Sequence, residues 1–239
     1  MTADGPPVGA APREYRQARF VAPPGSTQIL LVRHGESRAA TADNPFPLVD
    51  GHGDPELHAD GRKQAQQVGE RLKGLPISAV YVTNLQRTAE TAAPLCRHLG
   101  LDPIVEADLR EVFLGEWDGG LMRIKAAENH PIMQRVRAEQ RWDVIPGAES
   151  NAALDERIGR GLRRVAANHP DELVVAVVHG GVIARVMAMA TGAEPFAFAG
   201  ADNGSISHIV MSAEAILVRR FNDCSHLTEG FGAVRSQMT

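Results

Sequence analysis

The chain lacks several features that would assign it to particular classes of protein. It has no apolar run near the roughly 20 residues that a membrane-spanning helix requires, so we expect no membrane contact. Cys96 and Cys224 are its only cysteines, and neither lies in a zinc-binding spacing. A chain of 239 residues also needs no disulfide scaffold. We therefore expect a protein of the reducing cytoplasm that binds no metal.

Basic residues are not in excess either. The formal net charge is −4 and the Lys and Arg residues are spread along the chain, so nucleic acid is not an expected partner. The length fits one sizeable α/β domain. Residues 1–25 are rich in Pro, Gly and Ala and are predicted to form a flexible arm, and residues 228–239 a tail. The domain itself is predicted over residues 26–227.

Two apolar segments each lead directly into a histidine followed by glycine. Ile29–Val32 precedes Arg33-His34-Gly35, and Leu173–Val178 precedes His179-Gly180. Apolar runs without alternation are typical of parallel strands covered on both faces, and ligands of such sheets bind beyond the carboxyl ends of the strands. The glycines let the backbone approach a bound group closely. We therefore predict that both histidines lie at one edge of a sheet and that the bound group is a phosphate.

The rest of the chain alternates between predicted strands and helices, which favours a three-layer α/β/α sandwich with a mostly parallel central sheet. Segment 41–60 is rich in Pro and Gly and is predicted to be a long loop. Segment 115–149 is charged and mostly helical, and is predicted to be an insert over the active site. Strands are expected at 77–82, 103–105, 206–211 and 215–221, and helices at 61–73, 83–100, 150–168 and 182–191.

Two arginines lie where they can reach the predicted phosphate. Arg33 precedes His34, and Arg87 begins the helix that follows strand 77–82. A guanidinium group binds two phosphate oxygens at once and remains charged at physiological pH. With His179, these residues predict a cationic phosphate pocket.

Such a pocket suits phosphoryl transfer without a metal or organic cofactor. One imidazole attacks phosphorus as a neutral nucleophile, and the other donates a hydrogen bond to the transferring group. A carboxylic acid must then protonate the leaving alkoxide. Glu111 is the candidate for this role, and Glu116 is its competitor.

Several motifs in the same order resemble those of the histidine phosphatase superfamily, also called phosphoglycerate mutase-like, over roughly residues 29–227. They include Leu31–Ser37, Arg87–Ala92, Leu109–Glu111 and Val178–Gly181. The resemblance implies His34 as the nucleophile that becomes phosphorylated and Glu111 as the proton donor, with no cofactor. It implies Arg33, Arg87 and His179 as phosphate-binding residues, with Ser37, Gly180 and Asn203 in supporting positions.

The chain also departs from this family. Many members carry an asparagine that touches the phosphate where this chain has Ala40, and we consider Asn44 or a loop backbone group as its replacement. Two of the supporting residues have simpler explanations, since Ser37 is compatible with a helix cap and Asn203 with a turn. Trp117 and Trp142 are predicted to be packing residues.

The predicted function is hydrolysis of a small phosphorylated metabolite through a phosphohistidine on His34, with a pH optimum on the acidic side of neutrality. Phosphoglycerate mutase is one alternative, disfavoured because a Trp-Asn pair after the first motif and a long basic insert are both absent. A non-catalytic phospho-ligand binding module is another, disfavoured by the intact set of histidines and arginines. The closing strands offer an edge for a homodimer. Six basic residues either bind a second acidic group of the substrate or only decorate a helix: Arg38, Arg123, Lys125, Arg135, Arg137 and Arg141.

Overall fold

The computed structural model describes residues 14–227. The predicted tail at 228–239 and the first thirteen residues of the predicted arm lie outside this range. Residues 14–22, the next part of the arm, have no regular secondary structure. Within the described residues, no helix is both long and apolar enough to cross a membrane.

A six-stranded sheet forms the centre of the molecule, in the order β5-β4-β6-β1-β7-β8. The first four of these strands are parallel to one another. At the other edge, β7 pairs antiparallel with both β1 and β8. The sheet is therefore mostly parallel, as predicted. The strands are β1 (Thr27–Arg33), β4 (Ile77–Val82), β5 (Ile104–Val105), β6 (Leu173–Val178), β7 (Ile206–Met211) and β8 (Ile216–Asp223).

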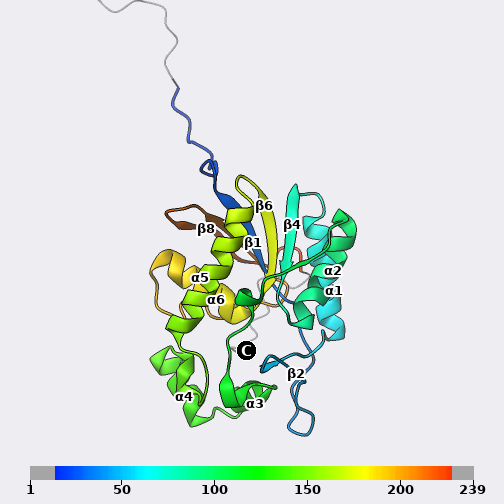
Figure 1. The fold of residues 1–239 in the computed structure, drawn as a ribbon, viewed down its shortest axis with the longest axis vertical. Helices are drawn as coiled ribbons and strands as arrows, with labels where there is room; N and C mark the ends of the chain where they lie inside the picture. The colour runs from blue at the N-terminus through cyan, green and yellow to red at the C-terminus, as the bar shows by residue number, and fades with distance from the viewer. Residues whose placement is uncertain (1–13, 228–239) are drawn as a thin grey trace, which may run out of the picture.

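Helices cover both faces of this sheet (Figure 1). One face packs on α1 (Ala59–Leu72) and α2 (Gln86–Leu99), and the other on α5 (Asn151–Asn168) and α6 (Gly180–Thr191). Successive residues of β1 enter opposite layers, so Leu30 packs with the first pair of helices and Leu31 with the second. Burial on both faces explains why the strands carry continuous apolar runs. The fold is a three-layer α/β/α sandwich.

Segment 115–149 forms the helices α3 (Leu121–Ala127) and α4 (Pro131–Glu139) and two short 3₁₀ turns, η2 (Gly115–Trp117) and η3 (Trp142–Val144). Trp117 is buried there in a small separate core with Met133, Val136, Val144 and Ile145. Figure 1 shows α3 and α4 below the sheet, beyond the carboxyl ends of its parallel strands. The insert therefore lies at the edge where ligands of parallel sheets bind.

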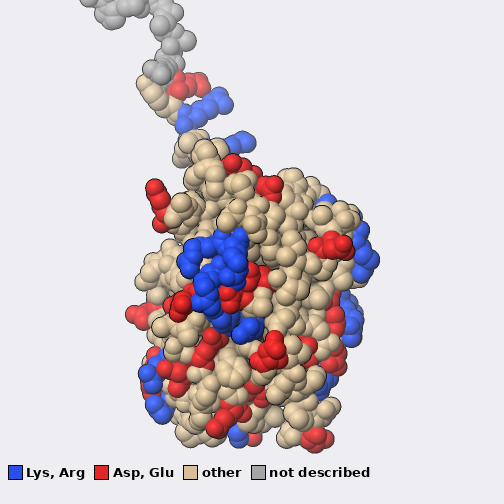
Figure 2. All heavy atoms as spheres, in the orientation of Figure 1, with Lys and Arg blue, Asp and Glu red and all other residues tan. Residues whose placement is uncertain are grey.

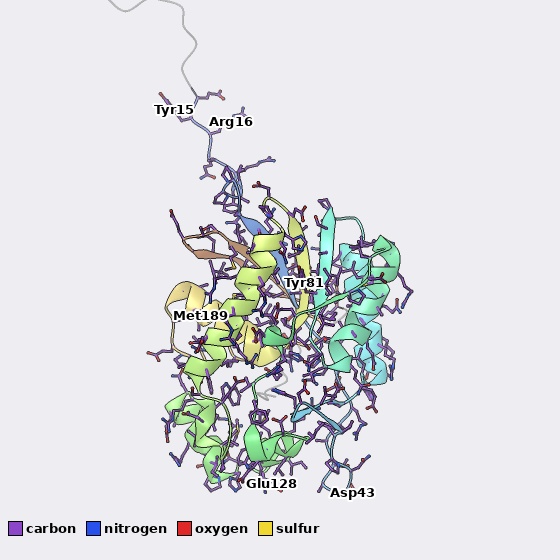
Figure 3. All side chains as sticks on the ribbon, in the orientation of Figure 1. Tyr15, Arg16, Asp43, Tyr81, Glu128 and Met189 are labelled. Atoms are coloured by element: carbon purple, nitrogen blue, oxygen red, sulfur yellow. The ribbon has the colours of Figure 1, made fainter. Side chains whose placement is uncertain are left out.

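The prediction of a structureless loop at 41–60 was wrong in two respects. The segment contains a short antiparallel pair, β2 (Leu48–Val49) and β3 (His52–Gly53), and α1 begins at Ala59 rather than Gly61. Strands of two residues are too short to show a periodic pattern in the sequence. Figure 3 shows Asp43, in this segment, and Glu128, just after α3, at the same end of the molecule, opposite Tyr15 and Arg16.

The surface carries charges of both signs. Figure 2 shows Lys and Arg side chains gathered over α5, with carboxylates among them. Two of the α5 arginines are ion-paired: Arg164 lies 2.7 Å from Glu106 and 2.5 Å from Asp108, and Arg160 lies 3.0 Å from Glu156. The positive charge of this cluster is thus largely compensated locally.

Candidate active site

The pairing of β1 with β6 brings the two histidines together. Arg33 is aligned with Val178 in the parallel ladder, so His34 and His179 are the next residues of adjacent strands. The backbone N–H of His34 donates to the carbonyl of Val178 at 3.0 Å. The two imidazole rings have centroids 5.2 Å apart. One bound group can therefore contact both rings.

His34 has the protonation state that a nucleophile requires. Its Nδ1 lies 2.7 Å from the carbonyl oxygen of Gly35, which only accepts hydrogen bonds, so Nδ1 carries the proton. The lone pair then resides on Nε2, which accepts a hydrogen bond from Arg87 Nε at 3.2 Å. Burial, together with the charges of Arg87 and Arg33, holds the pKa of His34 well below its usual value. His34 is therefore neutral at physiological pH, with a basic nitrogen available.

His179 is held by a threonine pair. Its Nε2 lies 3.0 Å from the hydroxyl of Thr83, which in turn lies 3.2 Å from the hydroxyl of Thr88 on α2. The other ring nitrogen, Nδ1, is buried and has no hydrogen-bond partner among residues 14–227. Burial and the charge of Arg87 also lower the pKa of this histidine. Nδ1 is thus the atom left to contact a ligand.

Arg87 is positioned by the segment that was predicted to be a loop. Its Nη1 donates to the carbonyl of Gly53 in β3 at 2.9 Å, and lies 3.9 Å from the carboxylate of Asp54. The same carboxylate accepts a hydrogen bond from the backbone N–H of Gln86 at 2.8 Å, at the first residue of α2. Segment 41–60 therefore fixes the guanidinium that faces His34.

Arg33 packs against the amino end of α6. Its Nη1 donates to the carbonyl of Ala201 at 2.5 Å. A Cβ added to Gly180 would come within 3.3 Å of Arg33 Nε, so the absence of a side chain at that position allows the close approach. Gly180 thus packs against Arg33 beside the site.

Glu111 lies at the other side of the α6 amino end. Its carboxylate accepts hydrogen bonds from the backbone N–H of Val112 at 2.9 Å and of Gly181 at 3.4 Å. A Cβ on Gly181 would lie 2.5 Å from Glu111 Oε1, so only glycine leaves room for this carboxylate. Its competitor Glu116 is exposed on η2. The geometry favours Glu111 as the acid.

Arg157, which was not predicted from the sequence, holds the backbone of Glu111 in place. This buried arginine of α5 donates to the carbonyls of Arg110 at 2.7 Å and Glu111 at 2.8 Å. It also donates to Glu149 at 3.0 Å, whose carboxylate accepts from the backbone N–H of Phe113. A charged residue on the apolar face of helix 150–168 was the available signal.

Arg123 is a second residue whose place was not predicted. Its Nη2 donates to the hydroxyl of Ser37 at 2.8 Å and its Nη1 to the carbonyl of Arg38 at 2.9 Å. Burial and the nearby charges of Arg87 and Arg33 lower its pKa to about 10. A third guanidinium is therefore held next to the first two.

The other five basic residues considered as ligands of a second acidic group each have a nearby partner. Lys125, Arg135 and Arg141 form ion pairs with carboxylates within the insert, and Arg137 donates to Asn129. Arg38 pairs with Glu56 at 3.2 Å. The charge of Arg123 contributes to the lowered pKa of His34.

The remaining predicted residues are placed as follows. Asn203 donates from Nδ2 to the carbonyl of His34 at 2.9 Å, so its side chain supports the histidine backbone. Ser37 caps no helix, because it lies in an isolated bridge with Leu57. Asn44, suggested as a replacement for the missing asparagine, lies in an exposed turn in which its backbone N–H donates to the carbonyl of Thr41.

The described residues contain one cluster whose side chains are close enough to share a metal ion: Glu36, His58 and Asp60. His58 is the N-cap of α1, and its ring accepts a hydrogen bond from the backbone N–H of Asp60. Two members of this cluster, His58 and Asp60, lie at the start of α1, and both are exposed.

Comparisons with known proteins agree with this geometry. The sequence profile of the histidine phosphatase superfamily (branch 1) matches residues 29–224. Phosphoglycerate mutase-like protein 4 of Arabidopsis thaliana is 41% identical over 160 residues, which are 65% of this chain and 67% of that protein. Phosphoserine phosphatase 1 of Hydrogenobacter thermophilus is 30% identical over 205 residues, which are 84% of this chain and 95% of that protein.

A solved structure is similar as well. The mycobacterial glucosyl-3-phosphoglycerate phosphatase matches with a TM-score of 0.66 and 26% identity, covering 82% of this chain and 99% of that chain. The profile match extends over most of the chain and includes the residues that surround His34. The chain belongs to the histidine phosphatase superfamily.

Proposed function

We propose that this phosphatase hydrolyses a phosphate monoester through a phosphohistidine on His34, without a metal or organic cofactor. The observation that carries the proposal is the state of His34: neutral, protonated on Nδ1, and with Nε2 facing the guanidinium of Arg87. An imidazole in this state is a nucleophile, and a guanidinium beside it binds the group that it attacks.

In the first half-reaction, the lone pair of His34 Nε2 forms a bond to phosphorus as the bond from phosphorus to the leaving oxygen breaks. Arg33, Arg87 and His179 Nδ1 hold the three remaining phosphoryl oxygens, whose charge is spread in the transition state. Glu111 gives its proton to the leaving oxygen, so the product departs as an alcohol.

In the second half-reaction, the same carboxylate accepts a proton from water as the water oxygen attacks phosphorus. The bond from phosphorus to His34 Nε2 breaks, the electron pair returns to the imidazole, and inorganic phosphate leaves. Glu111 is held at the α6 amino end by two backbone N–H groups, a position from which one carboxyl group can serve both steps.

Arg123 supplies the phosphate contact that Ala40 cannot make. A Cβ on Gly120, which precedes α3, would lie 3.1 Å from the Cβ of Ala40, so the small residue lets α3 approach the loop after β1. Arg123 then reaches Ser37 and stands within electrostatic range of Arg33 and Arg87. In this role Ser37 orients Arg123.

The names of the relatives support hydrolysis, since phosphoserine phosphatase 1 and the glucosyl-3-phosphoglycerate phosphatase are both phosphatases. Because another relative is named phosphoglycerate mutase-like protein 4, the experiment below also tests for mutase activity. We place the enzyme in the reducing cytoplasm, which is consistent with the free thiols of Cys96 and Cys224.

The proposal is tested by trapping the intermediate. Rapid acid-free quenching with a ³²P-labelled aryl phosphate should yield an acid-labile, alkali-stable adduct in the wild type. The His34→Ala variant should form no adduct and lose about three orders of magnitude or more in kcat. His58→Ala, which removes an exposed histidine, is the matched control and should behave as the wild type.

Two results would refute the proposal. One is phosphate release by His34→Ala at the wild-type rate. The other is interconversion of 2- and 3-phosphoglycerate faster than phosphate release, which would make the protein a mutase.

A further inference from the structure

An apolar pocket opens directly beside the phosphate site. It holds about 680 Å³ of space when the open solvent at its mouth is included. It begins at Arg33 and Glu111 and extends between the insert and segment 193–200. Its walls are formed mainly by Val112, Leu114, Met122, Met133, Trp142 and Phe196.

The two sides of this pocket are tied to each other. The rings of Trp142, on η3, and Phe196 have centroids 5.0 Å apart. The backbone N–H of Phe196 donates to the side-chain oxygen of Gln140 at 3.0 Å, which joins segment 193–200 to the end of α4. The aromatic walls are therefore already in place in the structure without a ligand.

The pocket also offers no free charge beyond its phosphate end. Arg185 is the remaining charged residue of its lining. It is buried, and Asp155 accepts from its Nε at 2.8 Å and its Nη2 at 2.6 Å, so its charge is compensated. Arg185 Nη1 is buried and has no hydrogen-bond partner among residues 14–227, so it can donate to a neutral oxygen of a bound group. A carboxylate placed here would lose its hydration and compete with Asp155 for the charge of Arg185.

We propose that this pocket receives the leaving group, and that the substrate is the phosphate monoester of an uncharged, mainly apolar alcohol, aromatic or branched. The inference rests on the proposed function, because it is Glu111 at the mouth of the pocket that protonates the leaving oxygen. It separates this chain from an enzyme for phosphoserine or phosphoglycerate, whose leaving groups carry charge next to the ester.

The first experiment compares esters on the wild-type enzyme. Benzyl phosphate presents an apolar alcohol, and O-phosphoserine and 3-phosphoglycerate present charged ones. Since each methylene accommodated in an apolar pocket is worth about tenfold or more in specificity, kcat/KM for benzyl phosphate should exceed that for either charged ester by at least about tenfold.

The second experiment shortens the wall of the pocket. Phe196→Ala should lower kcat/KM for benzyl phosphate about tenfold while changing that for O-phosphoserine less than about twofold. Phe198→Ala is the matched control, since Phe198 lies in the same segment, does not line the pocket and packs on Phe221 with ring centroids 5.2 Å apart. It should change both esters to the same extent.

The outcomes separate the two proposals. Equal or better turnover of the charged esters, or equal losses on both esters in Phe196→Ala, would overturn the apolar pocket as leaving-group site while leaving the phosphohistidine mechanism intact. Absence of a labelled adduct on every ester would overturn the proposed function and this inference with it.

Discussion

At the scale of the residue, the central device is an imidazole that stays neutral among cations. Isolated histidine protonates near pH 6.5. In the buried site, Arg33 and Arg87 disfavour a second positive charge, so the lowered pKa of His34 keeps Nε2 available in mildly acidic solution. The same cations attract the phosphate dianion. In the proposed mechanism the arginines therefore both bind the substrate and keep the nucleophile neutral.

This arrangement predicts how activity depends on pH. Because the pKa of His34 is lowered, kcat/KM should remain high below pH 6.5, where an ordinary histidine becomes protonated. The optimum is expected on the acidic side of neutrality. The measurement is a profile of kcat/KM from pH 4.5 to 9 for the wild type and Glu111→Gln.

The variant isolates the contribution of Glu111. The second ionisation of a phosphate ester, near pH 6, affects both enzymes equally. Glu111→Gln should therefore be slow at every pH, because an amide cannot give a proton to the leaving oxygen. A wild-type profile that climbs steadily into alkali would contradict the assignment.

At the scale of the element, the insert does more than cover the site. Its helix α3 reaches back to the loop after β1, where Arg123 contacts Ser37 and Arg38 and lies over the ring of Phe46. A short helix of seven residues gains little stability from its own hydrogen bonds, so such contacts with neighbouring elements hold it in place.

We expect Arg123→Met to lower kcat/KM about 10- to 100-fold, the effect of losing a hydrogen bond from a charged donor to the phosphate. The loss should be the same for benzyl phosphate and O-phosphoserine, since both present the same phosphate. Lys125→Met, on the same helix, should have little effect because Lys125 pairs with Glu128. A loss confined to O-phosphoserine would show that Arg123 binds a carboxylate of the substrate instead.

At the scale of the whole molecule, the buried histidines affect stability. Burial lowers the pKa of His34, His179 and His52, that of His52 to about 4. In the unfolded chain these groups take up protons below about pH 6.5, whereas in the folded chain they do not. The unfolded state therefore binds more protons in acid, and the free energy of unfolding falls as pH decreases through 6.5.

Denaturation by urea at pH 7.5 and 5.5 should show a decrease of roughly 1 to 3 kcal/mol at the lower pH. Burial raises the pKa of Asp54 and Asp118, which opposes this trend, so a second variant is needed. His52→Gln should show a smaller decrease between the two pH values than the wild type. A midpoint that is unchanged or higher at pH 5.5 would rule out this account.

Local sequence patterns were sufficient to predict the central sheet of this protein and the residues at its edge. The apolar runs at 29–32 and 173–178 predicted two buried strands with their histidines at one edge of the sheet, and the structure pairs these strands directly. Arg33 and Arg87 were predictable for the same reason, since each is adjacent to a strand end or a helix start. Their places in the fold follow from strand ends and a helix start, whereas the contacts that orient the two guanidinium groups come from distant segments.

Only the tertiary structure decided the contacts made between distant segments. Arg123 was indistinguishable from five other basic residues until α3 was placed against Ser37, 86 residues away along the chain. The hydrogen bond from Arg87 to His34 Nε2 likewise joins residues 53 positions apart, and the apolar pocket exists only where the insert meets segment 193–200. The sequence by itself determined where the proposed phosphate site lies, because strands and their ends are local. Packing of separate elements decided what surrounds that site, because no local pattern records which side chains meet.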